Sequence, residues 1–589
     1  MNPPDAVRIG LVQCKPAKGD LSQNLETVRA HLAEAADLLL FPETVLTGYF
    51  VEGAVQELAL TSQELVERLG PPPGDSAPDV VLGFYERAEH DLHNSLAYLT
   101  PEDGAYRVVH VHRKVFLPTY GIFEEARFVE PGRSVAAFDT RWGRMGMLVC
   151  EDLWHSLPAS ILALDGATIL LCGSASPARG FRPNKSGSPE NLAEWDRIGP
   201  RTAKEHGVYV AIAQLVGSEG GKLFPGGSSA WGPDGEILTR GPLFEEATTV
   251  VAVRRREITR VRAESPLLSD LRTALPHLRT SLDRAFTGAS AANGAGTRRP
   301  QAVPLPRDTT APGAELPPVN LAIDAGLVET ALVEFIREEV ERRRGFQRVV
   351  VGVSGGVDSA VSLYLACKAL GPENVFGFRL PYATSSQESL DHAALALEAT
   401  GAQQRTITIT GAVDGYVDAE EPDLSPMRRG NLAARLRSVI LFDQSAKLRA
   451  LPLGTGNKSE RLLGYYTWHA DDSPPINPLG DLLKTQVWQL ARHLGVPDII
   501  VDKPASADLI RGVHDEDELG VSYHEADPVL YWFLRGLTPE DVVAGGFPRP
   551  QVETVWQRLS STHWKRELPT VAMISDTAIG EAYLRPVDY

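Results

Sequence analysis

Cysteine is scarce in this chain, and its few copies form no pattern. Cys14, Cys150, Cys172 and Cys367 are spread over 589 residues without a C-x-x-C pair, so neither a disulfide framework nor a zinc site is indicated. The first residues, MNPPDAVRIG, lack the basic and apolar regions of a signal peptide. No apolar run is long enough to span a bilayer. We therefore expect a cytoplasmic protein with reduced thiols and no membrane partner.

Positive charge is also in short supply. Lys and Arg number 58 against 76 Asp and Glu, a formal net charge of −18, and the pI is near 5.3. Such a surface repels phosphates, so neither nucleic acid nor an anionic membrane is expected as the main partner. The apolar share of 43% is ordinary for a globular protein. Because 589 residues exceed what one hydrophobic core serves, two domains are expected.

A glycine-rich loop in the second half carries the strongest chemical signal. Residues 349–360 read VVVGVSGGVDSA, a β-branched run that turns at Ser354-Gly355-Gly356 and enters a helix near Asp358. Glycines and a helix N-terminus together make a phosphate cradle. The loop has neither the Lys of a Walker A motif nor a G-x-G-x-x-G pattern. It resembles the pyrophosphate loop of the N-type ATP pyrophosphatases, which transfer AMP from ATP to a carbonyl or carboxyl oxygen.

The first half alternates strands with helices, which predicts an α/β layered domain. Strands are expected at 7–12, 37–41, 79–85, 95–99, 107–112, 143–149, 167–171 and 208–213, and a helix over 21–36 with Ser22 as a candidate cap. Glu43, Lys114 and Cys150 stand just past strand ends, where α/β folds place chemistry. Each of them alone is equally explained as a solvated acid, a surface lysine or a small core residue.

Together, the strings around these residues resemble the nitrilase superfamily over roughly residues 5–255. They read FPE around Glu43, HRKVFLP around Lys114 and CEDLW from Cys150. The resemblance implies an α-β-β-α sandwich with Glu43 as general base and Lys114 as oxyanion stabiliser. Cys150 would be the nucleophile that forms a thioester and releases ammonia. A second glutamate assists in this superfamily; Glu125 is the matching position, with Glu124 adjacent.

Within that superfamily, CEDLW and SASP at 174–177 resemble the glutaminase domain of the glutamine-dependent NAD⁺ synthetases. The resemblance places Tyr120, Ser176 and Arg182 on the L-glutamine substrate. Arg suits an α-carboxylate because it can donate two hydrogen bonds at once. The segment after Ser176 departs from the usual string, so Arg179 is an alternative to Arg182.

The composition changes between the two halves. Residues 257–320 pass from arginine-rich, helix-like sequence at 260–282 to a stretch dominated by Ala, Gly, Pro and Thr. This predicts a linker at 257–320 between a first domain, 1–256, and a second domain, 321–589. The alternative is that the central part folds into one of the domains.

The second half is predicted to be a doubly wound, Rossmann-like parallel sheet that binds ligands at the carboxyl ends of its strands. Strands are expected at 349–353, 374–380, 404–409 and 451–453, and helices over 327–344, 387–400 and 431–449. Asp358 and Glu460 follow two of these strands and could hold Mg²⁺, which favours a few carboxylates with phosphate oxygens. Glu460 alone is also explained as a first-turn helix acid.

Several long strings here are similar to the NAD⁺ synthetase domain over roughly residues 320–589. They read GNLAARLRSVILF, LGTGNKSERLLGYYTWHADD, INPLGDLLKTQVWQLARHLGVPDII, KPASADL and HDEDELGVSY. The resemblance implies an ATP site made of Ser354, Gly355, Gly356, Val357, Asp358, Ser359 and Thr455. It implies contacts to deamido-NAD from Asn431, Glu460, Tyr465, Trp468, Lys484, Asp508 and Lys565. Trp468-His469 replaces the residues usual after the GYYT string.

The two resemblances imply one coupled reaction. Glutamine hydrolysis would supply ammonia, and ATP would activate the nicotinate carboxylate of deamido-NAD for amidation, giving NAD⁺, AMP and pyrophosphate. We expect protected passage of ammonia from Cys150 to Asp358, and a homo-oligomer by analogy. The alternatives are an ammonia-only ligase with a structural N-terminal module, a nucleotide sensor, and an amidotransferase of the GMP or asparagine synthetase type.

Overall fold

The computed structural model describes residues 4–74, 76–184, 187–292, 316–505, 514–567 and 572, without the side chains of 286–292. The chain separates into two compact units. The described parts of 1–180 and 188–297 form the first unit, and those of 181–187 and 298–570 form the second. Each unit is an α/β fold, as predicted. Within the described residues, no helix has the length and apolar character that crossing a membrane requires.

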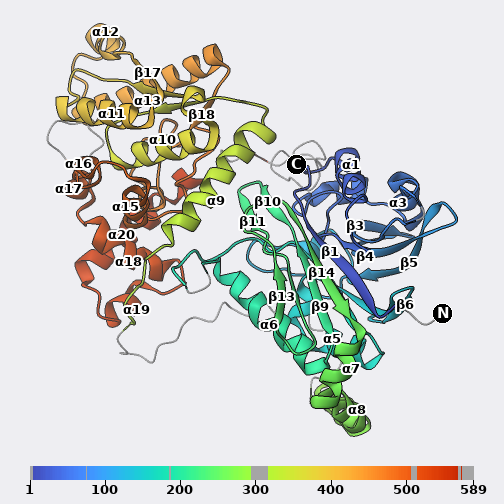
Figure 1. Ribbon diagram of the computed structural model, residues 1–589. Coiled ribbons are helices and arrows are strands. Elements are labelled where there is room, and N and C mark those ends of the chain that lie inside the picture. The colour runs from blue at the N-terminus through green and yellow to red at the C-terminus, as the bar shows by residue number, and fades with distance from the viewer. Residues whose placement is uncertain are drawn as a thin grey trace. The chain divides into compact units, whose positions relative to one another are not determined.

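Two six-stranded sheets form the centre of the first unit (Figure 1). The order of the first is β14 (Ala247–Arg254), β1 (Ala6–Gln13), β2 (Leu38–Leu40), β3 (Asp79–Ala88), β4 (Asp91–Glu102), β5 (Ala105–Arg113). The order of the second is β13 (Ile237–Arg240), β12 (Ser229–Trp231), β9 (Tyr209–Gln214), β8 (Ile169–Ser174), β7 (Gly143–Val149), β6 (Phe138–Thr140). Strands β1 to β3 are parallel, as are β7 to β9.

Alternating side chains hold these sheets face to face. In β1, Leu11 belongs to the apolar cluster between the sheets, whereas its neighbour Val12 packs outward. Helices α1 (Leu21–His31) and α3 (Ser62–Leu69) cover the outer face of the first sheet. Helices α5 (Ser156–Leu164) and α6 (Glu190–His206) cover that of the second. The layers are those of the predicted α-β-β-α sandwich.

The start of α1 differs from the prediction at one residue. Asp20 caps the helix, because its Oδ1 accepts a hydrogen bond of 3.0 Å from the backbone N–H of Gln23. Ser22, the predicted candidate, lies inside the first turn. Asp and Ser are both good N-cap residues, so the cap is decided by where the helix begins, which is Leu21.

Two helices occupy the start of the segment predicted as a linker. They are α7 (Arg255–Glu264) and α8 (Leu267–Ala292). Ile258 and Val261 of α7 are buried, so this helix packs against the first unit. The Ala-, Gly- and Pro-rich part, 293–315, lies outside the described residues. The domain boundaries at 256 and 320 stay a prediction.

A four-stranded parallel sheet organises the second unit (Figure 1). Its order is β17 (Gln403–Thr406), β16 (Val375–Arg379), β15 (Val349–Gly352), β18 (Leu451–Leu453). One face packs on α9 (Ala325–Arg337), α10 (Val357–Leu370), α11 (Gln387–Thr400) and α15 (Lys484–Leu494). The other face packs on α12 (Thr410–Glu420) and α13 (Pro426–Leu448). Helices on both faces are what a doubly wound fold requires.

The C-terminal part adds a helical cluster with its own core. Helices α18 (Tyr523–Phe533), α19 (Pro539–Ala544) and α20 (Arg549–Ser561) bury Tyr523, Leu530, Val542 and Val555 together. The sequence analysis did not predict these helices. Tyr523 connects this cluster to the sheet, because its ring lies 5.3 Å from the Nζ of Lys484 at the start of α15.

Candidate active sites

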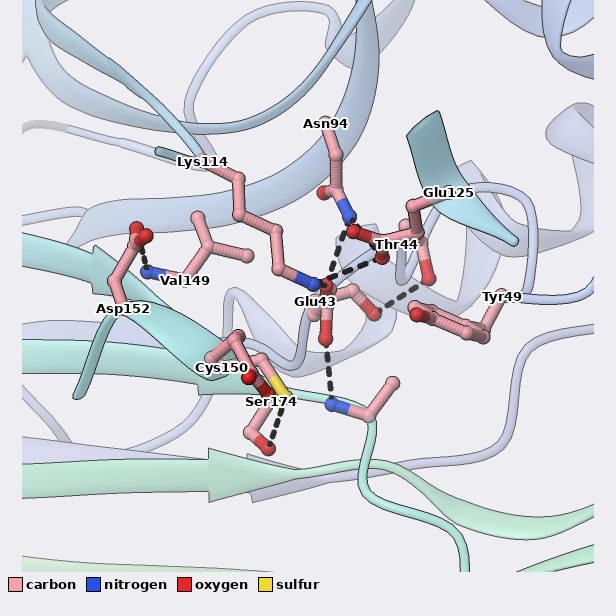
Figure 2. A network of polar contacts seen from close by, with 12 residues as sticks. Glu43, Thr44, Tyr49, Asn94, Lys114, Glu125, Val149, Cys150, Asp152 and Ser174 are labelled. Carbon is pink, nitrogen blue, oxygen red and sulfur yellow. Dashed lines mark hydrogen bonds and ion pairs between the residues drawn. The ribbon is translucent and has the colours of Figure 1, made fainter. Parts of the chain in front are cut away.

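Three strand ends of the first unit bring the predicted catalytic residues together. Glu43 follows β2, Lys114 follows β5, and Cys150 follows β7. The first two strands lie in one sheet and the third in the other, so the residues meet where the two sheets face each other. Figure 2 shows the side chains of Glu43, Lys114 and Cys150 converging on one point.

Lys114 is the centre of this first site. Its side chain is fully buried, and its Nζ lies 2.7 Å from Glu43 Oε1 and 2.8 Å from Glu125 Oε1. Asn94, on β4, donates from Nδ2 to the same two oxygens at 2.7 and 3.2 Å. One ammonium and one amide therefore hold both buried carboxylates in place (Figure 2).

Glu43 is also held from the side of the nucleophile. Its Oε2 accepts the backbone N–H of Ala175 at 2.9 Å. The preceding residue, Ser174, donates from its hydroxyl to Cys150 Sγ at 3.4 Å. The same short segment thus contacts both the carboxylate and the sulfur.

The backbone at Cys150 is strained. Its φ is 43° and its ψ is −101°, in a region that residues with a Cβ rarely occupy. Cys150 is the residue between β7 and the short helix α4 (Glu151–Trp154). Such a turn presents a side chain outward from a strand end, and strain of this kind is found mainly at functional sites.

The charges of this site favour a neutral thiol beside a charged lysine. Burial and the nearby Glu43 raise the pKa of the Cys150 thiol well above its usual value, although Lys114 acts to lower it. Burial acts to lower the pKa of Lys114, but Glu125 and Glu43 outweigh it and raise this pKa well above the usual value. Burial also raises the pKa of Glu125. A carboxylate base is therefore needed before the sulfur can act.

The residues predicted to hold glutamine separate into two groups. Tyr120 is exposed beside this site, and its hydroxyl donates to Glu151, the neighbour of Cys150, at 3.0 Å. The Ser176 hydroxyl accepts from Asn191 at 3.1 Å. Arg182 belongs to the second unit, where its guanidinium donates to the Tyr531 hydroxyl at 3.3 Å.

Arg179, the alternative to Arg182, stays in the first unit. Its guanidinium lies 5.2 Å from the centre of the Phe123 ring. Phe123 in turn packs edge-on against Tyr120, with the ring centres 5.7 Å apart. Within the first unit, Arg179 therefore lies beside residues that border Cys150.

The glycine loop of the second unit has the predicted strand–turn–helix form. It connects β15 to α10, and Val357 is the first residue of that helix. The Ser359 hydroxyl accepts the backbone N–H of Ser354 at 3.2 Å and donates to the carbonyl of Gly356 at 3.0 Å. Gly355 has φ +85°, and a Cβ there would lie 2.1 Å from the carbonyl oxygen of Ser389. Only glycine fits this turn.

A second buried lysine connects the two loops of this site. The Nζ of Lys484 is hydrogen-bonded to Asp358 and lies 3.2 Å from Glu460 Oε1. Asn457 donates to the other oxygen of Asp358 at 2.8 Å and caps the helix that carries Glu460, α14 (Lys458–Leu463). The predicted metal ligands therefore face a common point, which a cation already occupies.

The carboxylates at this point outnumber the lysine. Burial raises the pKa of Glu460 to about 8, with Lys484 opposing the rise and Asp358 adding to it. Burial acts to lower the pKa of Lys484, but Asp358 and Glu460 raise it well above its usual value. Because burial is the main cause of the raised pKa, a further cation beside Glu460 would favour its charged form.

Comparison with known proteins identifies the second unit. The NAD synthase family matches residues 328–569. The NH(3)-dependent NAD(+) synthetase of Chlorobaculum parvum is 46% identical over 264 residues, which are 45% of this chain and 95% of that protein. The chain belongs to the NAD synthase family. The carbon-nitrogen hydrolase family matches the other part, residues 8–263.

Two relatives extend the likeness over the whole chain of this NAD synthase. The glutamine-dependent NAD(+) synthetase of Thermotoga maritima is 29% identical over 605 residues, which cover 99% of this chain and 98% of that protein. The solved glutamine-dependent NAD+ synthetase of Acinetobacter baumannii, in complex with ADP, is 24% identical and covers 98% of this chain and 97% of its own, with a TM-score of 0.69. The latter likeness shows a shared fold.

Three of the residues predicted for the dinucleotide have local contacts within the second unit. Asn431 accepts from the Thr467 hydroxyl at 3.1 Å, and the Trp468 ring packs edge-on at 5.3 Å on Trp564. Lys565 donates to the carbonyls of Gly464 and Tyr466 at 2.8 and 3.0 Å.

The other residues predicted for the dinucleotide have different partners. The Tyr465 hydroxyl donates to Glu518 at 2.6 Å, and Lys484 and Glu460 belong to the buried pair described above. Thr455 lies in the loop between β18 and α14. Asp508 lies outside the described residues.

The sequence analysis missed three residues at the first site. Asn94 donates to both Glu43 and Glu125, Glu151 accepts from the Tyr120 hydroxyl, and Asp152 is fully buried two residues after Cys150. Glu151 and Asp152 stand in the CEDLW string, so two consecutive acids after the cysteine were a usable signal. Asn94 carried none, because it lies in the middle of a strand.

No set of three or more His, Cys, Asp or Glu side chains converges as a metal site in the described part of the chain. A protein-only metal site is therefore not indicated among these residues. Asp358 and Glu460 supply two carboxylates, which suits a Mg²⁺ that takes its remaining ligands from phosphates and water.

Proposed function

We propose that this protein is a glutamine-hydrolysing NAD⁺ synthase. Its first unit would hydrolyse glutamine to glutamate and ammonia. Its second unit would adenylate the nicotinate carboxylate of deamido-NAD with ATP and let ammonia displace AMP, giving NAD⁺, AMP and pyrophosphate. Support comes from the family, from full-length similarity to glutamine-dependent relatives and from the buried sets around Lys114 and Lys484.

In the first unit the chain's own groups account for each proton transfer. Glu43 takes the thiol proton as Cys150 attacks the amide carbon, and the same proton then passes to the departing ammonia. Lys114 stays charged throughout and stabilises both the thiolate and the oxyanion. Water, deprotonated by Glu43, releases glutamate from the thioester. Glu125 keeps Lys114 charged by balancing it.

Glutamine would be held through the two charged groups on its α-carbon, the carboxylate and the ammonium. We assign its α-carboxylate to Arg179, which can donate two parallel hydrogen bonds. We assign its α-ammonium to Glu151, which the Tyr120 hydroxyl orients from 3.0 Å. Ser176, which lies two residues beyond Ser174, would complete this contact set.

In the second unit the glycine loop and Lys484 would act on ATP. The backbone N–H groups at the start of α10 favour phosphate, and the hydroxyls of Ser354 and Ser359 line the turn. The carboxylate of deamido-NAD attacks the α-phosphorus, pyrophosphate leaves, and ammonia attacks the resulting acyl adenylate. Contacts to the dinucleotide are proposed for Asn431, Trp468 and Lys565.

Asp358 and Glu460 would hold Mg²⁺ in this site. Their carboxylates converge on one point, and burial, with Asp358 adding to it, raises the pKa of Glu460, so a further cation there would favour its charged form. When bound, Mg²⁺ would neutralise charge on the leaving pyrophosphate. Lys484 supplies a fixed positive charge at the same place and orients both carboxylates.

The observation that carries the proposal is the buried ammonium of Lys114 between two carboxylates, beside a strained cysteine. A purely structural lysine does not need a nucleophile next to it. The test is to assay NAD⁺ from deamido-NAD, ATP and Mg²⁺ with either glutamine or ammonium as nitrogen donor. In Cys150→Ala we expect glutamine-driven synthesis to fall at least 1,000-fold while ammonia-driven synthesis is kept.

The competing function is an ammonia-only ligase whose first unit is a scaffold. It is favoured by the 46% identity of the second unit to an NH(3)-dependent synthetase. If wild type and Cys150→Ala both use ammonium equally and neither uses glutamine, the scaffold reading holds. A homo-oligomer and a cytoplasmic location stay predictions from sequence.

A further inference from the structure

A second carboxylate lies directly behind the nucleophile and takes no part in the steps above. Asp152 is two residues after Cys150 in α4, and none of its surface is exposed. Each of its oxygens accepts two N–H groups. Oδ1 accepts the backbone N–H groups of Val115 and Phe116 at 2.9 and 3.0 Å, and Oδ2 accepts those of Val149 and the His112 ring at 3.1 and 2.9 Å.

These four donors come from the two segments that carry Lys114 and Cys150. Val115 directly follows Lys114, and Val149 directly precedes Cys150. The carboxylate therefore joins the end of β5, in one sheet, to the end of β7, in the other. Figure 2 shows its hydrogen bond to Val149 next to the Lys114 and Cys150 side chains.

The carboxylate of Asp152 already accepts four hydrogen bonds from the protein, so it is not placed to contact a substrate. We propose that Asp152 is a positioning residue, which fixes the Lys114 ammonium relative to the Cys150 sulfur. This deepens the glutaminase function proposed above and rests on it. The electrostatic help that Lys114 gives the thiolate depends on their separation, and misplacing catalytic groups by about 1 Å can cost on the order of 100-fold in rate.

Asp152→Asn is the sharpest change because it keeps size and shape. An amide can still accept two N–H groups with its oxygen, but its own NH₂ then faces the other two donors. One of the two segments must move away, and the Lys114-to-Cys150 separation changes with it.

Asp79 offers a matched control in the same unit. It is also fully buried, and it accepts from Tyr98 at 2.6 Å, Thr100 at 2.7 Å and Arg141 at 3.0 Å. It lies at the start of β3, whereas Glu43 follows the carboxyl end of the parallel neighbour β2. Asp79→Asn therefore imposes a similar loss of buried hydrogen bonds without touching the segments of Lys114 or Cys150.

The experiment measures alkylation of Cys150 by iodoacetamide against pH on the full chain, resolved by peptide mass spectrometry, together with glutamine kinetics. For Asp152→Asn we expect the alkylation midpoint to move up by a pH unit or more. We expect kcat with glutamine to fall about 100-fold with KM nearly unchanged. Asp79→Asn should lower the melting temperature comparably and leave both readouts alone.

Three outcomes overturn the proposal: an unchanged alkylation profile in folded Asp152→Asn, an equal shift in Asp79→Asn, or a rise in KM alone. If Asp152→Asn does not fold, His112→Leu removes one donor and His112→Gln keeps one, so the first should shift the profile and the second should restore it. Alkylation needs no glutamine turnover. A chain that lacks glutaminase activity but shows the Asp152 dependence would sink the proposed function and leave the positioning role standing.

Discussion

Two lysines in this protein lie in the same kind of environment. Lys114 is buried between Glu43 and Glu125, and Lys484 is buried between Asp358 and Glu460. In each case two carboxylates face one ammonium, so one negative charge is left over. Such a surplus is relieved by a proton or by another cation. In the first site burial, with Glu43 adding to it, raises the pKa of Glu125. In the second site burial, with Asp358 adding to it, raises the pKa of Glu460 enough to make the pH dependence of stability measurable.

Replacing Glu460 tests this surplus at the second site. Its folded pKa of about 8 lies above the unfolded value of about 4.3, so between these values the folded state holds a proton that the unfolded state has lost. This group's stabilising share is complete below the unfolded pKa and is lost as pH rises toward 8, at up to about 1.4 kcal/mol per pH unit. Melting temperatures from pH 5 to 9 should therefore decline less steeply in Glu460→Gln than in the wild type.

The exposed Glu420→Gln on α12 is the matched control, and it should melt with the wild-type pH profile. The same samples report on Mg²⁺. Millimolar Mg²⁺ with ATP should raise the melting temperature of wild type more than that of Glu460→Gln. Identical pH profiles for wild type and Glu460→Gln would contradict the raised pKa of Glu460.

The three residues expected just past strand ends in the first unit do lie together in the structure, and their roles stay predictions. Glu43, Lys114 and Cys150 could be singled out because their positions after apolar strands are visible in the sequence and the strings around them resemble one superfamily. Asn94 could not, since it is one polar residue in a strand and its role depends on pairing across the sheet. Arg179 and Arg182 could not be separated, because three residues of chain decide which unit each one joins.

At the scale of elements, the glycine loop between β15 and α10 makes the strictest demand on sequence. Gly355 needs a positive φ, and a Cβ would meet the Ser389 carbonyl oxygen at the start of α11. Gly355→Ala should therefore cost at least about 1–2 kcal/mol from backbone strain alone, with the clash added. We expect a lower melting temperature and loss of NAD⁺ synthesis with either nitrogen donor.

The adjacent glycine provides the control. Gly356 has φ −94°, and the nearest atom to a Cβ there is the Ser354 hydroxyl oxygen at 3.5 Å. Gly356→Ala should keep the wild-type melting temperature by calorimetry, whatever it does to ATP binding. Equal melting temperatures for both variants would show that the turn adapts and that the strain argument is wrong.

Elements with a clear apolar period were predicted, and those stabilised by tertiary contacts were not. Strand β7 and helix α11 have the predicted bounds, Gly143–Val149 and Gln387–Thr400. The hairpin of β10 (Val216–Glu219) and β11 (Lys222–Pro225) was missed. Its buried Glu219 binds the backbone N–H groups of Tyr49 and Phe50 at 2.9 Å each. Such a hairpin follows no binary pattern, because its polar residue faces inward to satisfy another loop.

On the scale of the whole molecule, two chemistries share one chain. Ammonia is mostly protonated in neutral water, and ammonium is a poor nucleophile. Ammonia that passes directly to the acyl adenylate should therefore react better than ammonia that is released into water. We expect little ¹⁵N in NAD⁺ when turnover with unlabelled glutamine proceeds in the presence of ¹⁵N-ammonium, as mass spectrometry of the product can measure.

Cys150→Ala supplied with ¹⁵N-ammonium alone is the reference for full labelling. Its second unit keeps every group placed on ATP and the dinucleotide, so its NAD⁺ should carry one label per molecule. Substantial label in the wild-type product during glutamine turnover would exclude protected transfer and leave two independent activities.

The strained backbone at Cys150 affects how an inactive variant of the first site is best designed. At φ 43° and ψ −101°, any residue with a Cβ has a strained backbone, which costs about 1–3 kcal/mol of folding free energy. Glycine is the residue that would relax there. An inactive variant that still binds glutamine is thus better made as Cys150→Gly than as Cys150→Ala. Both variants lack the sulfur, but Cys150→Gly should also have the higher melting temperature.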